Sequence, residues 1–122
     1  RIVWMSAADP ASPCGLGLSE VYGDLPQRSS GNHLVFRGPQ LVMISRRNGR
    51  DLQIIVEADD PDLGQMLIPL RAMVTRRASP RDRIVVETIN GTPVRESPFA
   101  PALRSAGFRD EFRSYVLSAP YR

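Results

Sequence analysis

The stretch that decides the fold runs from residue 83 to residue 108 and reads RIVVETINGTPVRESPFAPALRSAGF. Its first part, residues 83–89, predicts a β-strand because β-branched side chains pack well on a pleated surface. In an unbroken strand Ile84 and Ile89 would point to opposite faces of the sheet. Asn90-Gly91 accommodates positive φ angles, so the strand is predicted to end there in a tight turn.

The second half of this stretch predicts a short helix. Ser97 is a helix N-cap residue, and Pro98 suits the first helical position because its missing N–H is not needed there. Apolar residues then recur at i, i+4 and i+7, which gives the helix one apolar face. Gly107 is predicted to end the helix, and Phe108 is expected to fold back onto the last turn.

Upstream, alternating apolar residues predict four more strands. One is expected at residues 2–6, and three others, 33–36, 40–46 and 51–57, are expected to form an antiparallel meander. The Asn48-Gly49 pair is a strong hairpin signal between the last two of these. Both faces of the strand 40–46 are apolar along most of its length, which predicts a central strand covered on both sides.

A second helix is predicted after Asp59-Asp60-Pro61, where a carboxylate cap precedes a proline. Pro69 interrupts the pattern, so either the helix kinks there or a separate main helix begins at Pro69. A last strand is predicted at 112–118. Apolar residues with helical spacing mark this helix: Leu63, Met66, Leu67, Leu70 and Val74. The predicted fold is α+β: a mostly antiparallel sheet, made of the three-stranded meander plus further strands, with two helices packed on one face.

Length and composition agree with one globular domain, residues 1–122. The chain has 122 residues, 42% of them hydrophobic, and a single cysteine, so an intrachain disulfide is excluded. No apolar run approaches the length that spans a bilayer, and no signal peptide is visible. The chain begins at Arg1 in the middle of a predicted strand, which suggests a fragment of a larger protein.

The basic residues are all arginines, and their distribution says more than the net charge of +3. Codon usage in a GC-rich genome explains the preference for arginine over lysine. Arginines without acids fill residues 28–50, acids without arginines fill 51–62, and arginines return at 71–83. Such blocks either make a basic edge or neutralise one another across the fold.

The predicted hairpin tip carries the best candidate site, Arg46, Arg47 and Arg50. Three guanidiniums on a protruding turn can contact phosphates along a nucleic-acid backbone. The alternative is a solvated turn whose charges keep a sheet edge soluble. No catalytic, cofactor-binding or metal-binding residue is predicted.

Other chemistry lacks its usual signals. There is no GxxxxGK[ST] phosphate-binding loop, and one histidine with one cysteine does not make a structural zinc site. The acidic group Asp59, Asp60 and Asp62 lacks the spacing of a calcium loop, and helix capping explains it better.

Three segments also resemble the C-terminal end of Lhr-type ATP-dependent helicases of bacteria. They are ETINGTPVRESPFAPALRSAGF at 87–108, SAADPASPCG at 6–15 and HLVFRGPQLVMISRRNGRDL at 33–52. The order matches that family, and together the segments cover most of the chain. Two departures are Ser12, where the family usually has Asn, and Gly38-Pro39, where Asp-Gly is more usual.

The resemblance implies a cytoplasmic parent enzyme that hydrolyses ATP, with Mg²⁺, to move on single-stranded DNA and unwind duplexes. This segment would be its accessory C-terminal domain, without an ATPase motif of its own. It would support the rest of the helicase chain and contact the backbone of single-stranded DNA.

Two alternatives belong to other classes. One is a protein-interaction or oligomerisation module that does not bind nucleic acid. The other is a glycosylase-like domain, whose chemistry needs a carboxylate poised beside a flipped base. Asp9, Asp24 and Asp110 lie near predicted loops, and nothing in the sequence singles one of them out.

Overall fold

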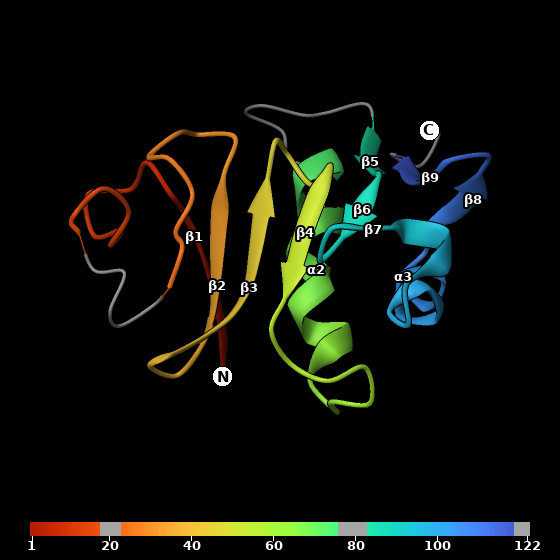
Figure 1. Ribbon diagram of the computed structural model, residues 1–122, viewed down its shortest axis with the longest axis horizontal. Helices are drawn as coiled ribbons and strands as arrows, with labels where there is room; N and C mark the ends of the chain where they lie inside the picture. Colours follow the sequence, from red (N-terminus) through yellow and green to blue (C-terminus); the bar gives the residue numbers. More distant parts are fainter. Residues whose placement is uncertain (18–22, 76–82, 119–122) are drawn as a thin grey trace.

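The computed structural model describes residues 1–17, 23–75 and 83–118. Its elements, in chain order (Figure 1), are β1 (Ile2–Ser6), β2 (His33–Arg37), β3 (Gln40–Arg46), β4 (Asp51–Ile54), α2 (Leu63–Thr75), β5 (Arg83–Val86), β6 (Thr88–Ile89), β7 (Thr92–Pro93), a 3₁₀ helix η1 (Val94–Glu96), α3 (Ala100–Ser105), β8 (Arg109–Glu111) and β9 (Ser114–Ser118).

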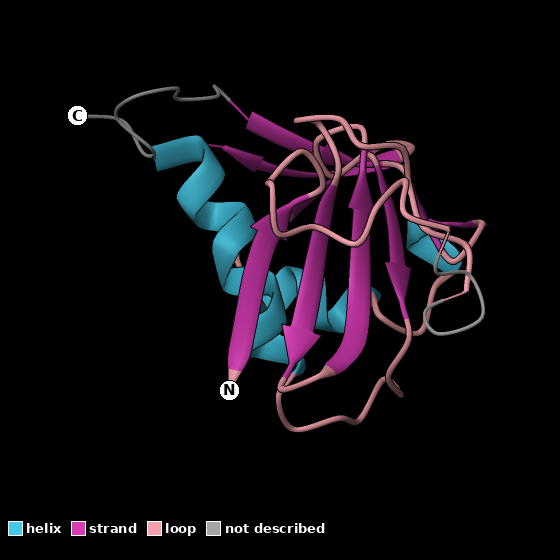
Figure 2. Cartoon of the chain, turned by 90° about the vertical axis from the view of Figure 1, so that its left-hand side faces the viewer, coloured by secondary structure: helices cyan, strands magenta, loops and turns pink. Residues whose placement is uncertain are grey.

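The strands form two sheets. The large sheet has six strands in the order β1-β2-β3-β4-β6-β7, and the small sheet has three in the order β5-β9-β8. All neighbours are antiparallel except β4 and β6. Helix α2 runs along one side of the large sheet (Figure 2). The predicted α+β class, with its mostly antiparallel sheet and meander, is confirmed.

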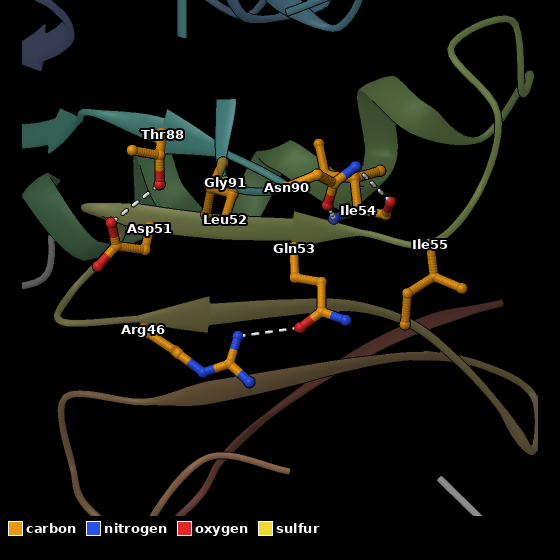
Figure 3. Close-up of a pocket in the computed structure, with 9 residues that line it drawn as sticks. All are labelled: Arg46, Asp51, Leu52, Gln53, Ile54, Ile55, Thr88, Asn90 and Gly91. Atoms are coloured by element: carbon orange, nitrogen blue, oxygen red, sulfur yellow. Dashed lines mark hydrogen bonds between the residues drawn. The ribbon is translucent and has the colours of Figure 1, made fainter. Parts of the chain in front are cut away.

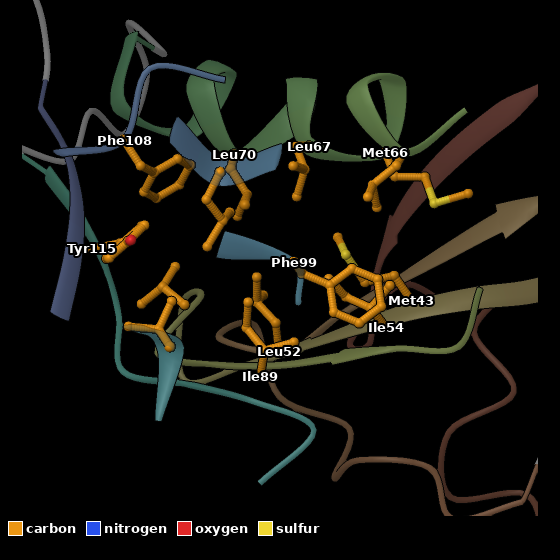
Figure 4. Close-up of a cluster of buried hydrophobic side chains, with 14 of the residues drawn as sticks. Met43, Leu52, Ile54, Met66, Leu67, Leu70, Ile89, Phe99, Phe108 and Tyr115 are labelled. Carbon is orange, nitrogen blue, oxygen red and sulfur yellow. The ribbon is translucent and has the colours of Figure 1, made fainter. Parts of the chain in front are cut away.

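The main core lies between the two sheets and the two described helices (Figure 4). Trp4 on β1 donates its indole N–H to the carbonyl of Met66, 3.0 Å away, and so ties the edge of the large sheet to α2. The predicted helix residues up to Leu70 are buried here, whereas the side chain of Val74 lies outside the described part. The core includes Val35, Met43, Leu52, Ile54, Leu63, Met66, Leu67, Leu70, Ile84, Val86, Ile89, Phe99, Leu103, Phe108 and Tyr115.

A smaller core covers the opposite face of the large sheet. Cys14 from the loop after β1 packs there with Leu34 and Ile44. Arg28 holds this loop in place, because its guanidinium donates to the carbonyl oxygens of Asp9, Ser12 and Cys14 at 2.8, 2.8 and 3.1 Å. The prediction that β3 is covered on both faces is therefore confirmed.

Strict alternation along β3 is interrupted by a β-bulge. Val35 pairs with Met43, whereas the next residue of β2, Phe36, pairs with Leu41. Val42 therefore has no residue opposite it. The extra residue puts Val42 and Met43 in the same core, while Leu41 lies in the other. A bulge of this kind bends the strand and cannot be seen in an alternating pattern.

The prediction of one continuous strand over residues 83–89 is wrong. The chain breaks at Glu87, so that β5 joins the small sheet and β6 joins the large one. The cause is the carbonyl of Arg50, which accepts from the backbone N–H groups of Glu87 and Thr88 at 2.8 and 3.1 Å. The break resets the alternation, so Ile89 enters the same core as Ile84 instead of the opposite face.

Strand β4 ends at Ile54, earlier than the predicted residue 57. At this end of β4 the side chain of Asn90 takes the place of a neighbouring strand. It accepts from the Ile54 N–H at 2.8 Å and donates to the Ile54 carbonyl at 3.1 Å. The predicted tight turn is confirmed, with Asn90 at φ 55° and Gly91 at φ 78°. That turn joins β6 to β7.

Helix α2 continues through Pro69, so the alternative of a separate helix beginning there is wrong. The helix begins at Leu63, and the carboxylate of Asp60 accepts from the backbone N–H of Asp62 at 2.9 Å just before it. Arg37 binds both carboxylates, at 2.9 and 3.1 Å. The Asp62 N–H and then Arg37 lower the pKa of Asp60, and the two carboxylates raise the pKa of Arg37.

Helix α3 is shorter than predicted and begins at Ala100, with Phe99 as its N-cap, so the predicted start at Ser97 and Pro98 is wrong. Ser97 still acts in the turn before it, where its hydroxyl accepts from the Phe99 N–H at 3.1 Å. The predicted helix end is confirmed: Gly107 has φ 104°, and the Phe108 N–H reaches the Leu103 carbonyl at 3.0 Å.

The last predicted strand, 112–118, is also corrected. Strand β9 begins at Ser114, and β8 precedes it in a hairpin that sequence reasoning missed. Phe112 lies in the connecting turn with φ 57°, not in the strand. Within the described ranges no helix has the length and apolar character needed to cross a bilayer.

Candidate nucleic-acid interface

The turn between β3 and β4 carries the predicted arginines. Arg46 pairs with Asp51, and the four residues between them form the loop. Arg47, Asn48 and Gly49 all have positive φ angles of 53°, 57° and 93°. A Cβ added to Gly49 would lie 2.8 Å from Cγ2 of Ile84, so the turn sits directly against β5.

The turn is anchored from its other side by the loop before β2. The Asn48 N–H donates to the Gly31 carbonyl at 2.8 Å, and the Arg47 N–H donates to Oδ1 of Asn32 at 3.1 Å. These bonds satisfy backbone groups that a tight turn would otherwise leave to water. The arginines therefore project from a backbone that is fixed on two sides.

Arg46 points along the outer face of the large sheet. Its guanidinium donates to Oε1 of Gln53 at 3.0 Å and to the Asp24 carbonyl at 3.4 Å. It lies at one end of a shallow groove of about 610 Å³ over β4 and β6, in which Gln53, Thr88 and Asn90 offer polar groups (Figure 3).

Arg47 and Arg50 are more exposed, and both pair with acids. The guanidinium of Arg47 contacts Oδ2 of Asp51 at 2.7 Å, and that of Arg50 contacts Oε2 of Glu87 at 2.6 Å. Asp51 also accepts from the Thr88 hydroxyl at 2.9 Å. The side chains of Arg47 and Arg50 are 62% and 47% exposed, so water screens both pairs.

The structure thus brings the three predicted arginines to one end of the large sheet, but it also brings two carboxylates to them. Exposed ion pairs contribute only about 0–1 kcal/mol, because each partner trades one set of hydrogen bonds for another. A phosphate that offers two oxygens to a guanidinium can replace such a partner at little energetic cost.

The other residues considered from sequence do not gather into a site. Asp9 accepts from the Ala11 N–H in its own loop, at 2.8 Å. Asp110, on β8, pairs with Arg95 at 3.4 Å. The loop after β1 and strand β8 lie at opposite ends of the molecule (Figure 1). Asp24 contributes its carbonyl to Arg46, not its carboxylate.

Metal ligands are not gathered either. Asp60 and Asp62 are held by Arg37. Over residues 1–17, 23–75 and 83–118, no three His, Cys, Asp or Glu side chains are placed to share a metal ion. Cys14 is fully buried, and the ring of His33 lies 5.8 Å from that of Trp4.

Sequence reasoning missed two residues, Glu87 beside the turn and Phe112 in the groove that Glu87 also lines. Glu87 reaches Arg50 only because β6 pairs with β4 in parallel, a long-range pairing with no local signal. Phe112 did carry a signal: charged residues flank it on both sides, in Asp110-Glu111-Phe112-Arg113, as in an exposed turn.

Comparison with known proteins identifies no family. No family model matches this chain, and no curated protein sequence matches it either. The functional proposal therefore rests on the geometry described above together with the resemblance seen in the sequence.

Proposed function

We propose that this chain is the accessory C-terminal domain of an Lhr-type ATP-dependent DNA helicase, and that it contacts the backbone of single-stranded DNA. The observation that carries the contact is the β3–β4 turn, where Arg46 ends β3 and Arg47 and Arg50 lie in a loop whose backbone is held by Gly31 and Asn32. ATP and Mg²⁺ would act in the rest of the parent chain, and this domain would supply support and positioning.

The pairing of the arginines with Asp51 and Glu87 fits such a role. Asp51 and Glu87 each restrain one guanidinium, so that less side-chain entropy is lost when a phosphate arrives. Because both acids stay beside the bound strand, the net attraction is modest. A weak, salt-sensitive contact is what a translocating strand requires, since it must be released at every step.

The test is titration of the domain with a fluorescent oligothymidine at low salt. The triple variant with Arg46, Arg47 and Arg50 changed to Ala is expected to bind more weakly than the wild type. Its plot of log affinity against log salt should also be flatter, by about 0.7 for every phosphate of the single strand that an arginine no longer neutralises.

A control removes exposed arginines elsewhere. Arg1 and Arg109 are exposed and lie outside the turn, and changing both to Ala should leave the salt slope unchanged. Equal affinity and equal slope for the wild type and the turn variant would refute the proposed contact.

A second candidate, a protein-interaction module, is favoured by one observation. A groove of about 600 Å³ lies between α2 and α3, and Ile68, which is 61% exposed, lies in it. Small residues, Gly64, Ala102 and Ala106, let a partner approach the helix backbones closely. In the isolated domain the occupant would be a second copy of the chain.

Sedimentation tests this second candidate. If the domain is an interaction module, it should associate as its concentration rises and should not bind oligothymidine. Ile68→Asp should then abolish the association. A monomer at every concentration, together with salt-dependent DNA binding, would favour the first proposal instead.

A further inference from the structure

The tip of the β8–β9 hairpin presents an aromatic ring to solvent. Phe112 is 77% exposed, more than any other large hydrophobic residue in the described segments. It also has φ 57°, in the left-handed region that Gly or Asn normally occupies. The exposed apolar surface and the left-handed backbone each raise the free energy of the folded chain. Such features are typical of binding surfaces.

Two arginines set the position of this ring. Arg95 donates to the Phe112 carbonyl at 3.1 Å and pairs with Asp110 at 3.4 Å, which fixes the turn to the segment after β7. The guanidinium of Arg113 lies 5.2 Å from the centre of the Phe112 ring. Cations that flank an exposed ring are typical of surfaces that stack the bases of single strands.

The ring borders a groove that also includes Glu87, the ion-pair partner of Arg50 in the arginine turn. This groove, of about 570 Å³, lies between the hairpin tip and the β6–β7 region, and Glu87, Pro93 and Glu96 also line it. Glu87 is the residue that accepts from Arg50 at 2.6 Å. Phe112 and the turn are far apart in sequence, but a single carboxylate separates the groove from Arg50.

The charges indicate how a strand would lie. Glu87 and Glu96 line the groove together with Arg95 and Arg113, so the acids and arginines of its lining balance, and the apolar surface of Phe112 and Pro93 suits the face of a base. The guanidiniums of Arg47 and Arg50 lie 3.9 and 2.6 Å from the carboxylate of Glu87. A strand with a base on Phe112 therefore meets Arg113 at the hairpin tip and, beside Glu87, the arginines of the turn.

We propose that Phe112 is a base-stacking platform for single-stranded nucleic acid, next to the phosphate contacts of the β3–β4 turn. This inference rests on the proposed function, because it adds a base contact to the backbone contact described above. Every base has a π-face, so the platform recognises single strands without selecting a sequence.

The experiment compares oligothymidine with an abasic oligomer of the same length, which keeps the phosphates and lacks the bases. Phe112→Ala is expected to weaken binding of oligothymidine by between about 5-fold and about 150-fold, the range for removal of a stacking aromatic. The same substitution should leave binding of the abasic oligomer and the salt slope unchanged, and Phe112→Tyr should bind like the wild type.

Leu16→Ala is the matched control, since Leu16 is also exposed, at 61%, but lies in the loop after β1. Circular dichroism establishes that each variant is folded, which the exposed position of Phe112 favours.

The outcomes separate this inference from the function on which it rests. If the wild type binds neither oligomer, both fail. If the turn variant loses affinity but Phe112→Ala does not, or loses it equally on both oligomers, the stacking platform is refuted and the backbone contact stands. If Phe112→Ala instead abolishes self-association in sedimentation, the ring anchors a protein, and stacking is likewise refuted.

Discussion

Replacing Gly49 by Ala should destabilise this fold more than the same change at Gly91, although both glycines have positive φ. At each site the new residue must adopt a left-handed conformation, which costs about 1–2 kcal/mol. The stiffer unfolded chain offsets about 0.4–1 kcal/mol of this. For Gly91, where no atom lies within 4 Å of the added Cβ, a net loss of about 1 kcal/mol is expected.

At Gly49 a steric term adds to this loss. The new Cβ would lie 2.8 Å from Cγ2 of Ile84 and 3.5 Å from Cδ2 of Leu70, and the first distance is shorter than real Cβ contacts allow. Ile84 and Leu70 are fully buried, so neither can move without disturbing its neighbours. Overpacking of this kind costs about 1–3 kcal/mol, which brings the total for Gly49 to about 2–4 kcal/mol.

Urea unfolding followed by circular dichroism measures both losses. The midpoint should fall in both variants, further for Gly49→Ala, while the slope of the transition stays unchanged. Equal losses for the two variants would show that the turn does not press against β5 and α2, and the packing described for this turn would be wrong.

Three further predictions concern other parts of the fold. Asn90→Ala removes two hydrogen bonds to β4 and should lower the free energy of unfolding by about 1–3 kcal/mol in a urea titration; a loss within error would contradict the ladder role. Asp60 has its pKa lowered by a backbone N–H and by Arg37, so its stabilising effect is present above about pH 4 and is lost as the pH falls through its lower folded pKa. The urea midpoint of the wild type should therefore approach that of Asp60→Asn on acidification, and parallel curves would refute this. Arg28→Ala should open the loop over Cys14, the only cysteine, and speed its reaction with a thiol reagent under native conditions; an unchanged rate would mean that other contacts hold the loop.

Local signals predicted the elements that are stabilised locally. The Schellman end of α3 at Gly107, the turn at Asn90-Gly91 and the meander all follow from residue types within a few positions of one another. The alternation along β3 failed at Val42 because a bulge depends on how β2 pairs with it, which no local pattern records.

The break at Glu87 shows the same limit more clearly. Residues 83–89 look like one strand because most of them are β-branched, but the Arg50 carbonyl, distant in sequence, binds the amides on both sides of the break between the two sheets. The candidate site behaves likewise. The arginines and their neighbour Asp51 could be named from the hairpin, whereas the contacts of Glu87 and the exposure of Phe112 depend on tertiary structure.

The shared carbonyl of Arg50 has a consequence for spectroscopy. A ligand that takes the Arg50 guanidinium away from the Glu87 carboxylate changes the charge beside the amides of Glu87 and Thr88, which the carbonyl of the same arginine holds. Their proton resonances should therefore shift together on titration and report occupancy of the turn.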